Sequence, residues 1–317
     1  MNFFQKLFSA VSPSGPNGKL TIFIFHRVLL KPDPLFPDEP DSKRFDQLMT
    51  WISSWFNVLP LDNAVLLLKD GSIPSRAACI TFDDGYADNF TVALPILKKH
   101  NLTATFFIST GFLDGGRMWN DTIIETFRSY SAKTLDLTAL GLEPIPLHSM
   151  LDKRNAIALV INKIKYLHPE QRTEFTGKFS ELTQVELPND LMMTSDQVRE
   201  MRNADMLIGA HTASHPILAK IDNKLAKTEI KNSKVFLEEL LGERIRLFAY
   251  PNGKAGTDYL PDHVAMVQEL GFEAAVSTES GCASKNCDFF QIPRFTPWDK
   301  HKFGFGGRIF RKLLSSR

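Results

Sequence analysis

Two adjacent carboxylates stand at the end of an apolar run in the first third of the chain. The run 77–82 carries no charge, and Asp83 and Asp84 follow it directly. Neighbouring carboxylates repel each other, so in a cleft at least one of them needs a cation or a hydrogen-bond donor to stay ionised. A later run carries two imidazoles four residues apart, His211 and His215. One carboxylate and two imidazoles make a three-ligand site for a divalent metal with room for water, which is typical of hydrolytic centres.

The composition is that of a globular protein with a substantial core. The chain has 317 residues, of which 43% are hydrophobic, and this length suits one large barrel or two modest domains. The formal charge of +1 gives no support to nucleic-acid binding driven by overall charge. Three cysteines without the spacing of a disulfide framework favour a reducing compartment. We find neither a signal-peptide pattern nor a run of about 20 apolar residues, so we expect a cytoplasmic protein.

Short apolar runs alternate with helical patterns along the chain. The expected strands are 20–25, 57–59, 77–82, 103–108, 206–210, 246–250 and 273–277. This alternation indicates a parallel α/β barrel or an open parallel sheet. We favour the closed barrel, because the active sites of barrels lie at the carboxyl ends of strands, and His26, Asp83, His211 and Pro251 all follow expected strands.

Three further segments complete the expected organisation. Residues 1–19 precede a barrel over residues 20–298. Residues from about 111 to 191 show helical periodicity without a clear buried strand, which predicts a mostly helical insertion on the catalytic rim. The final segment, 299–317, is basic and rich in aromatic residues. Such a tail suits peripheral contact with an anionic membrane, although a solvated end that packs a few aromatic residues on the barrel is the plainer interpretation.

Three runs together resemble motifs of a known enzyme family. They are 81–86, with the acid pair, 211–215, with the two histidines, and 248–253, which contains Pro251. In this order they are similar to the first three motifs of the polysaccharide deacetylase family, also called the NodB-homology or carbohydrate esterase 4 family. The resemblance covers roughly residues 20–298. It implies a distorted (β/α) barrel, usually of seven strands, and metal-dependent removal of an acetyl group from a sugar.

The resemblance also implies roles for the site residues. Asp84, His211 and His215 match the metal ligands, and Asp83 matches the general base that takes a proton from the attacking water. The backbone N–H of Tyr250 matches the group that stabilises the tetrahedral oxyanion together with the metal. Elementary electrostatics agrees with this division of the acid pair, because a metal holds one carboxylate as an anion and leaves its neighbour free to accept a proton.

Two parts of the usual family pattern are missing from this chain. The family places an arginine just before the proline of the third motif, and a Leu-x-Ile-x-His-like motif late in the chain. Some members look circularly permuted, with the histidine that serves as general acid on the first strand, and the run 22–26 is similar to that element. We therefore expect His26 to be the general acid and Arg294 to be the partner of Asp83. A buried core histidine and an ordinary ion pair are the alternatives.

Aromatic and polar residues near the motifs suit a sugar ligand. Tyr86, Trp119 and Trp298 could stack on the apolar face of a pyranose, although plain packing explains Trp119 equally well. Asn120 and Asp121 could line the rim of the site.

The sequence thus predicts a hydrolase that removes acetyl groups from N-acetylhexosamine units of a polysaccharide or lipid-linked oligosaccharide. The alternatives are an amidohydrolase acting on a small linear or cyclic amide and a catalytically silent carbohydrate-binding relative. A binding protein has no use for a base beside a metal, which argues against the last alternative. Zinc suits two imidazoles and a carboxylate, as do cobalt, nickel, manganese and ferrous iron. The sequence identifies neither the sugar nor the oligomeric state.

Overall fold

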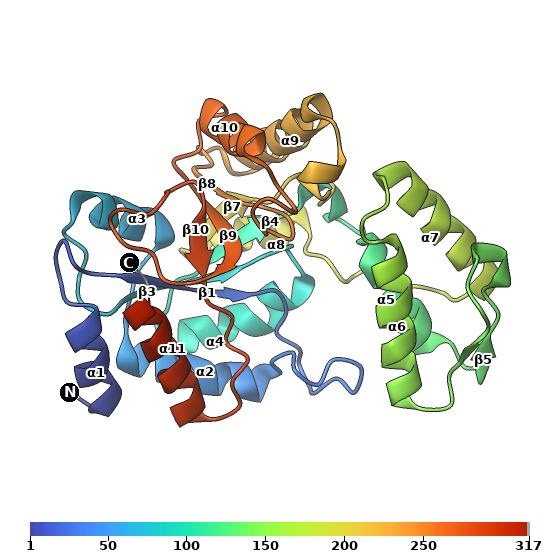
Figure 1. The fold of residues 1–317 in the computed structure, drawn as a ribbon, viewed down its shortest axis with the longest axis horizontal. Coiled ribbons are helices and arrows are strands. Elements are labelled where there is room, and N and C mark those ends of the chain that lie inside the picture. The colour runs from blue at the N-terminus through green and yellow to red at the C-terminus, as the bar shows by residue number, and fades with distance from the viewer. Residues whose placement is uncertain (316–317) are drawn as a thin grey trace.

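Seven parallel strands form a nearly closed barrel in the computed structural model, which describes residues 1–315 (Figure 1). In barrel order they are β1 (Leu20–Phe25), β3 (Ala77–Phe82), β4 (Thr105–Ile108), β7 (Leu207–Ala210), β8 (Leu247–Ala249), β9 (Ala274–Ser280) and β10 (Ile292–Arg294). A two-residue strand, β2 (Asn57–Val58), pairs with the start of β3. Phe295 links the two ends of the sheet, because its N–H donates to Ile22 O and its carbonyl accepts from Ile24 N–H. The predicted distorted (β/α) barrel is confirmed.

Strands β1 and β3 are neighbouring, parallel strands of the barrel. Every residue of both strands is buried, which explains their nearly uninterrupted apolar sequences. Their register pairs Leu20 with Ala77 and Phe25 with Phe82. Because the strands are parallel and end level with each other, the residues that follow them, His26 and Asp83, emerge at the same rim.

Strand β10 is missing from the strands expected from the sequence, the last of which was 273–277. The structure places Arg294 at the end of β10, paired with Ser280 of β9 after a register shift between Ile292 and Arg294. The sequence pattern did not predict this strand because Pro293 stands at its centre. Proline lacks the N–H that hydrogen-bonds within a sheet, so it normally argues against a strand.

Helices cover the outside of the barrel. They are α2 (Ser42–Trp55), α3 (Leu61–Asp70), α4 (Leu94–Lys99), α8 (Ser195–Asn203), α9 (Asn223–Leu241) and α10 (Pro261–Glu269). On α2, Phe45, Leu48, Met49 and Ile52 recur at helical spacing and are buried in the main core with side chains of the strands. The helices therefore bury one apolar stripe each against the barrel.

A mostly helical segment between β4 and β7 lies beside the carboxyl ends of the strands (Figure 1, right). It contains α5 (Trp119–Ser129), α6 (Met150–Ile164), α7 (Pro169–Thr183) and a short hairpin of β5 (Thr134–Leu135) and β6 (Ile145–Pro146). These elements share a hydrophobic cluster of their own, which includes Phe127, Val160 and Phe179.

The first and last helices pack against each other and against α2. They are α1 (Phe3–Val11) and α11 (Lys302–Ser315). The expected basic tail is thus a helix that buries Phe305 among aromatic rings of the barrel and α2; Arg317, which belongs to the same expectation, lies outside the described residues. Within residues 1–315, no helix is both long and apolar enough to cross a membrane.

Candidate active site

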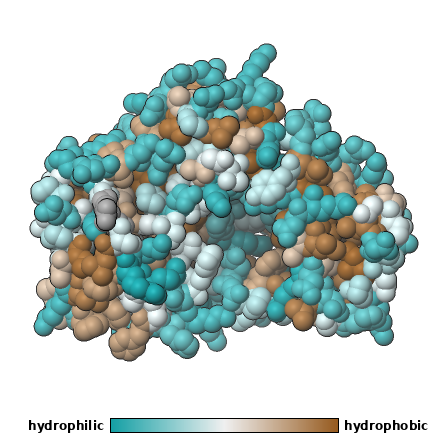
Figure 2. Space-filling view, viewed as in Figure 1, coloured by the Kyte–Doolittle hydropathy of each residue, from teal (hydrophilic) through white to brown (hydrophobic). Residues whose placement is uncertain are grey.

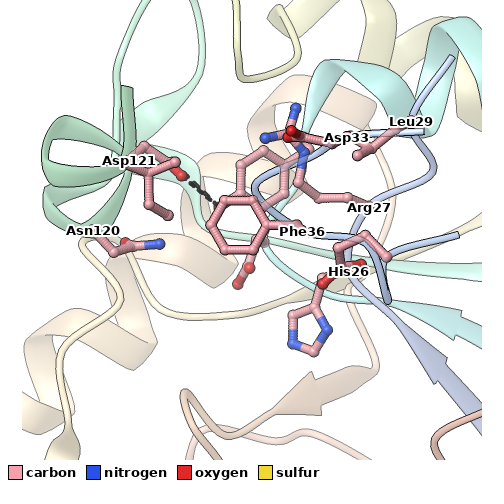
Figure 3. Close-up of a pocket in the computed structure, with 11 residues that line it drawn as sticks. His26, Arg27, Leu29, Asp33, Phe36, Asn120 and Asp121 are labelled. Carbon is pink, nitrogen blue, oxygen red and sulfur yellow. Dashed lines mark hydrogen bonds between the residues drawn. The ribbon is translucent and has the colours of Figure 1, made fainter. Parts of the chain in front are cut away.

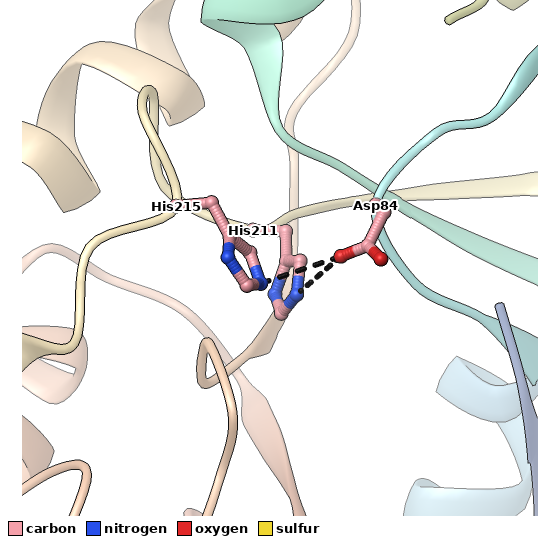
Figure 4. A group of neighbouring side chains, drawn as sticks. All are labelled: Asp84, His211 and His215. Carbon is pink, nitrogen blue, oxygen red and sulfur yellow. Dashed lines mark ion pairs between the residues drawn. The ribbon is translucent and has the colours of Figure 1, made fainter. Parts of the chain in front are cut away.

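Asp84, His211 and His215 gather at the carboxyl end of the barrel (Figure 4). Asp84 follows β3 and the histidines follow β7. Asp84 Oδ1 lies 3.4 Å from His211 Nε2 and 3.3 Å from His215 Nε2. The three potential ligand atoms all lie within 4.8 Å of one another. A single ion placed among them would contact one oxygen and two nitrogens, which suits a divalent transition metal.

The chain takes unusual backbone conformations at these ligands. Asp84, Thr212 and His215 have φ values of 79°, 63° and 52°, in the left-handed region that side chains other than glycine rarely adopt. Strained residues of this kind cluster at functional sites and persist where the surroundings hold them. Glu229 of α9 holds the loop, because its carboxylate accepts hydrogen bonds from the N–H groups of Ala213 and Ser214 at 3.0 and 2.7 Å.

The donor set fits a metal ion. Asp84 Oδ1 is buried and accepts no hydrogen bond from any residue of the described chain. His211 Nδ1 lies 2.7 Å from the carbonyl of Ala249, which places the proton on Nδ1 and leaves the Nε2 lone pair facing Asp84. Burial lowers the pKa of His215 to about 4, so this imidazole is neutral at physiological pH, the form that binds metals.

Asp83 and Arg294 form a buried bidentate ion pair. Arg294 Nη1 and Nη2 donate to the two oxygens of Asp83 at 2.7 and 2.6 Å, and Arg294 Nε donates to Ser277 O at 2.8 Å. Both side chains are buried. Burial alone would raise the pKa of Asp83, but the charge and hydrogen bonds of Arg294 outweigh it and hold that pKa below its ordinary value. Asp83 is therefore an anion next to the candidate metal ligands.

His26 emerges from the end of β1 and lines the same cavity as Asp84 (Figure 3). Its side chain is exposed, so the alternative of a buried core histidine is wrong. Its carbonyl accepts a hydrogen bond from Asn89 Nδ2 at 2.8 Å, which fixes the backbone at this point. The structure thus brings His26, Asp83, Asp84, and Arg294 to one rim.

Tyr250 does not offer the backbone N–H that the sequence led us to expect. Its N–H donates to Val276 O at 3.2 Å, because the ladder between β8 and β9 continues one residue beyond β8. Its side chain also faces away from the ligands, since its hydroxyl donates to Phe290 O and its ring stacks on Tyr259. Asn252, two residues later, lines a cavity with Asp84 and His215 instead.

A cavity of about 310 Å³ opens from Asp84 toward α5. Figure 3 shows His26, Asn120 and Asp121 around it. Asp121 is buried and accepts a hydrogen bond from Tyr86 Oη at 3.1 Å, and burial raises the pKa of Asp121 to about 7. The guanidinium of Arg27 lies 4.5 Å from the centre of the Tyr86 ring, so one face of this ring is covered.

The two tryptophans have different surroundings. Trp119 lies under the guanidinium of Arg172, 4.9 Å from the ring centre, and lines a second cavity of about 210 Å³ with Asp84 and His215. Trp298 is 72% exposed and lines a small cavity that reaches His26. Its free face is the more accessible of the two for a sugar ring.

Sequence reasoning missed three supporting residues. Arg27 forms an ion pair with Asp88 at 2.7 Å. Its position directly after His26 could have marked it as a site residue in the sequence. Glu229 supports the histidine loop from a helix, and no local pattern links it to that loop. Asn252 lies inside the third motif, in which the family resemblance implied the N–H of Tyr250 instead.

A sequence profile of the family described as polysaccharide deacetylase matches residues 70–140 and 162–275, more than half of the chain. The chain belongs to the polysaccharide deacetylase family. It is a hydrolase of carbon–nitrogen bonds other than peptide bonds, and the family implies a glycan substrate. YxkH of Bacillus subtilis (strain 168), whose name places it among polysaccharide deacetylases, is 20% identical over 278 residues, 87% of this chain and 70% of YxkH.

Solved structures share the fold of this family member. The Streptococcus pyogenes deacetylase PplD, solved in complex with acetate, aligns with a TM-score of 0.62 at 19% identity, over 93% of this chain and 98% of PplD. IcaB from Ammonifex degensii aligns with a TM-score of 0.59 at 18% identity, over 96% of this chain and 99% of IcaB. At these identities the likeness shows the barrel fold.

Proposed function

We propose that this enzyme removes acetyl groups from N-acetylhexosamine units of a polysaccharide or lipid-linked oligosaccharide, and that it depends on a divalent metal. The observation that carries the proposal is the split acid pair. Asp83 is an ionised carboxylate held by Arg294, while Asp84 faces two imidazoles and has one oxygen without a hydrogen-bond partner among the described residues. A hydrolytic centre needs both functions side by side.

Asp84, His211 and His215 would hold the metal. Zinc is our first choice, and cobalt, nickel, manganese or ferrous iron would also suit the donor set. When bound, the ion would polarise the acetyl carbonyl and lower the pKa of water in the site.

The chain's own residues would carry the protons. Asp83 would accept a proton from the attacking water, and Arg294 would keep it anionic until then. His26, on the neighbouring strand end, would donate a proton to the departing amine. The N–H of Asn252 would stabilise the oxyanion. Within residues 1–315 this N–H donates a hydrogen bond to no backbone carbonyl, which supports the assignment.

The surface beside these residues suits a glycan. Figure 2 shows the molecule hollowed between the barrel and the helices α5 to α7, where the two cavities next to Asp84 lie. Polar groups of Asn120 and Asp121 line one wall, and exposed Trp298 stands near the mouth. An open, partly aromatic groove favours an oligosaccharide over a small amide. We propose that the segment from about 111 to 191 supplies much of the specificity.

Acetate release from N-acetylated hexosamine oligosaccharides tests the proposal. We expect release by the metal-loaded enzyme, loss of release after treatment with a chelator, and recovery when zinc is added back. Metal-loaded enzyme that binds one ion but releases acetate from no such glycan would contradict the proposed substrate class.

A further inference from the structure

Helices α1 and α11 together form one surface that the proposed chemistry does not use. They pack closely because Gly306 has no side chain, and a Cβ at that position would overlap the ring of Phe4. Phe4 also contacts Trp55 of α2, with ring centres 4.4 Å apart, which anchors the pair of helices to the barrel. The relative placement of the two helices is therefore fixed by buried contacts.

Large apolar side chains project from this pair of helices into solvent. Phe3 is 67% exposed and Phe303 is 76% exposed, and the ring of Phe4 contacts both, with centre distances of 5.3 and 5.8 Å. Met1, just before α1, and Leu314, near the end of α11, are exposed as well. Figure 2 shows apolar side chains gathered over α1 and α11 at the lower left. Contiguous exposed apolar groups of this kind mark interaction sites.

The charged side chains of the two helices themselves have one sign. The sequences of α1 and α11 contain no Asp or Glu. Lys6 of α1 and Lys302 and Arg311 of α11 are exposed, whereas Arg308 is neutralised by an ion pair with Asp299. Exposed Phe and Leu ringed by Lys and Arg are the pattern of a surface that lies in the interface of an anionic bilayer.

We propose that this surface, formed by Met1, Phe3, Lys6, Lys302, Phe303, Arg311 and Leu314, binds anionic phospholipid bilayers and holds the enzyme on the membrane. The aromatic side chains would enter the headgroup region while the cations contact lipid phosphates. Self-association through the same face is disfavoured, because two copies would bring basic residues against each other.

The surface lies close to the mouth of the active site. Trp298 lines the cavity that reaches His26, and Phe303 is only the fifth residue after Trp298 along the chain. Even when fully extended, this stretch spans at most roughly 17 Å. A bound enzyme would therefore present its groove near the bilayer, where a lipid-linked glycan is held. This last step rests on the proposed function, whereas bilayer binding itself does not.

Cosedimentation with vesicles tests the proposal on the full chain. We expect binding to vesicles of phosphatidylcholine and phosphatidylglycerol at about three to one, weak binding to phosphatidylcholine alone, and a decrease between about 0.1 and 0.5 M NaCl. Two variants should each lose about tenfold or more of the binding constant: Phe3→Ser with Phe303→Ser, and Lys6→Glu with Lys302→Glu and Arg311→Glu. The matched control is Leu66→Ser with Phe236→Ser, which removes side chains that are 50% and 38% exposed on α3 and α9.

The control should bind as the unaltered chain does. Thermal unfolding and acetate release from a soluble oligosaccharide should stay unchanged in all three variants, which separates this proposal from the proposed chemistry. Equal binding to both kinds of vesicle, or full binding by the Phe and Lys/Arg variants, would overturn the proposal. A dimer in solution that dissociates in the Phe variant would overturn it too, because the surface would then be a contact between copies.

Discussion

At the scale of single residues, the site rests on how the backbone separates Asp83 from Asp84. Asp83 continues the direction of β3 and turns inward to Arg294, while the left-handed conformation of Asp84 aims its carboxylate at the histidines. Two neighbouring anions thus face different partners, the guanidinium of Arg294 for Asp83 and two imidazoles for Asp84. This separation lowers their mutual repulsion and gives each carboxylate one function.

Replacement of Arg294 by methionine should destabilise the protein most at neutral and alkaline pH. In the unaltered chain the pKa of Asp83 is lowered, so this group contributes stability above its unfolded pKa of about 4 that is lost at lower pH. Without Arg294, burial is the largest remaining influence on the pKa of Asp83 and should raise it, so the variant should lose stability as pH rises. We expect a loss of about 3–5 kcal/mol in the free energy of unfolding near neutral pH.

Urea denaturation at about pH 8 and about pH 5 measures this effect, and the loss should shrink at the lower pH. Arg308→Met is the matched control, because its partner Asp299 is partly exposed and the expected loss is about 1 kcal/mol or less. A loss of equal size at both pH values would contradict the assigned role of the ion pair.

Replacement of His26 by alanine should reduce turnover by about 10²- to 10⁴-fold, the usual contribution of a positioned acid. The exposed side chain supports no core contact, so metal content and thermal stability should remain unchanged. Deacetylation rate and metal content are the measurements, and His301→Ala, an exposed histidine, is the control. Near-full turnover with bound metal would remove His26 from the mechanism.

At the scale of elements, three segments remote in sequence support the rim. Strand β10 delivers Arg294, and Phe295 after it closes the barrel onto β1. Helix α9 supplies Glu229 to the histidine loop. Helix α11 covers β1 from outside by packing Phe305 on Phe23. The geometry of the site thus depends on packing of elements that hold no reacting group.

Two adjacent glycines of α11 should respond to alanine in opposite directions. Gly306→Ala should cost about 1–3 kcal/mol, because the new methyl group would overlap the ring of Phe4. Gly307→Ala should stabilise by up to about 1 kcal/mol, since nothing lies within 4 Å of a Cβ there and alanine favours the helix. Chemical denaturation of the two variants measures the difference. Equal stability of both would show that α11 does not pack on α1 as described.

At the scale of the whole molecule, the barrel was predictable from short apolar runs that end in chemically distinctive residues. Buried parallel strands such as β1 and β3 have nearly continuous apolar sequences, so they stand out. The sequence could not show that the N–H of Tyr250 is bonded to Val276 O within the sheet, because hydrogen bonds between β8 and β9 depend on their register. Glu229 was equally hidden, since a contact between a helix and a distant loop leaves no periodic pattern.

The most direct test of the account compares metal content and turnover in Asp84→Asn and Asp83→Asn, each purified and loaded in the same way. Asp84→Asn should lose both bound metal and acetate release, because it removes a ligand. Asp83→Asn should keep one equivalent of metal and lose only turnover, because it removes the base and leaves the ligands intact. Equal loss of metal from both variants, or undiminished turnover in Asp83→Asn, would contradict the division of labour between the two carboxylates.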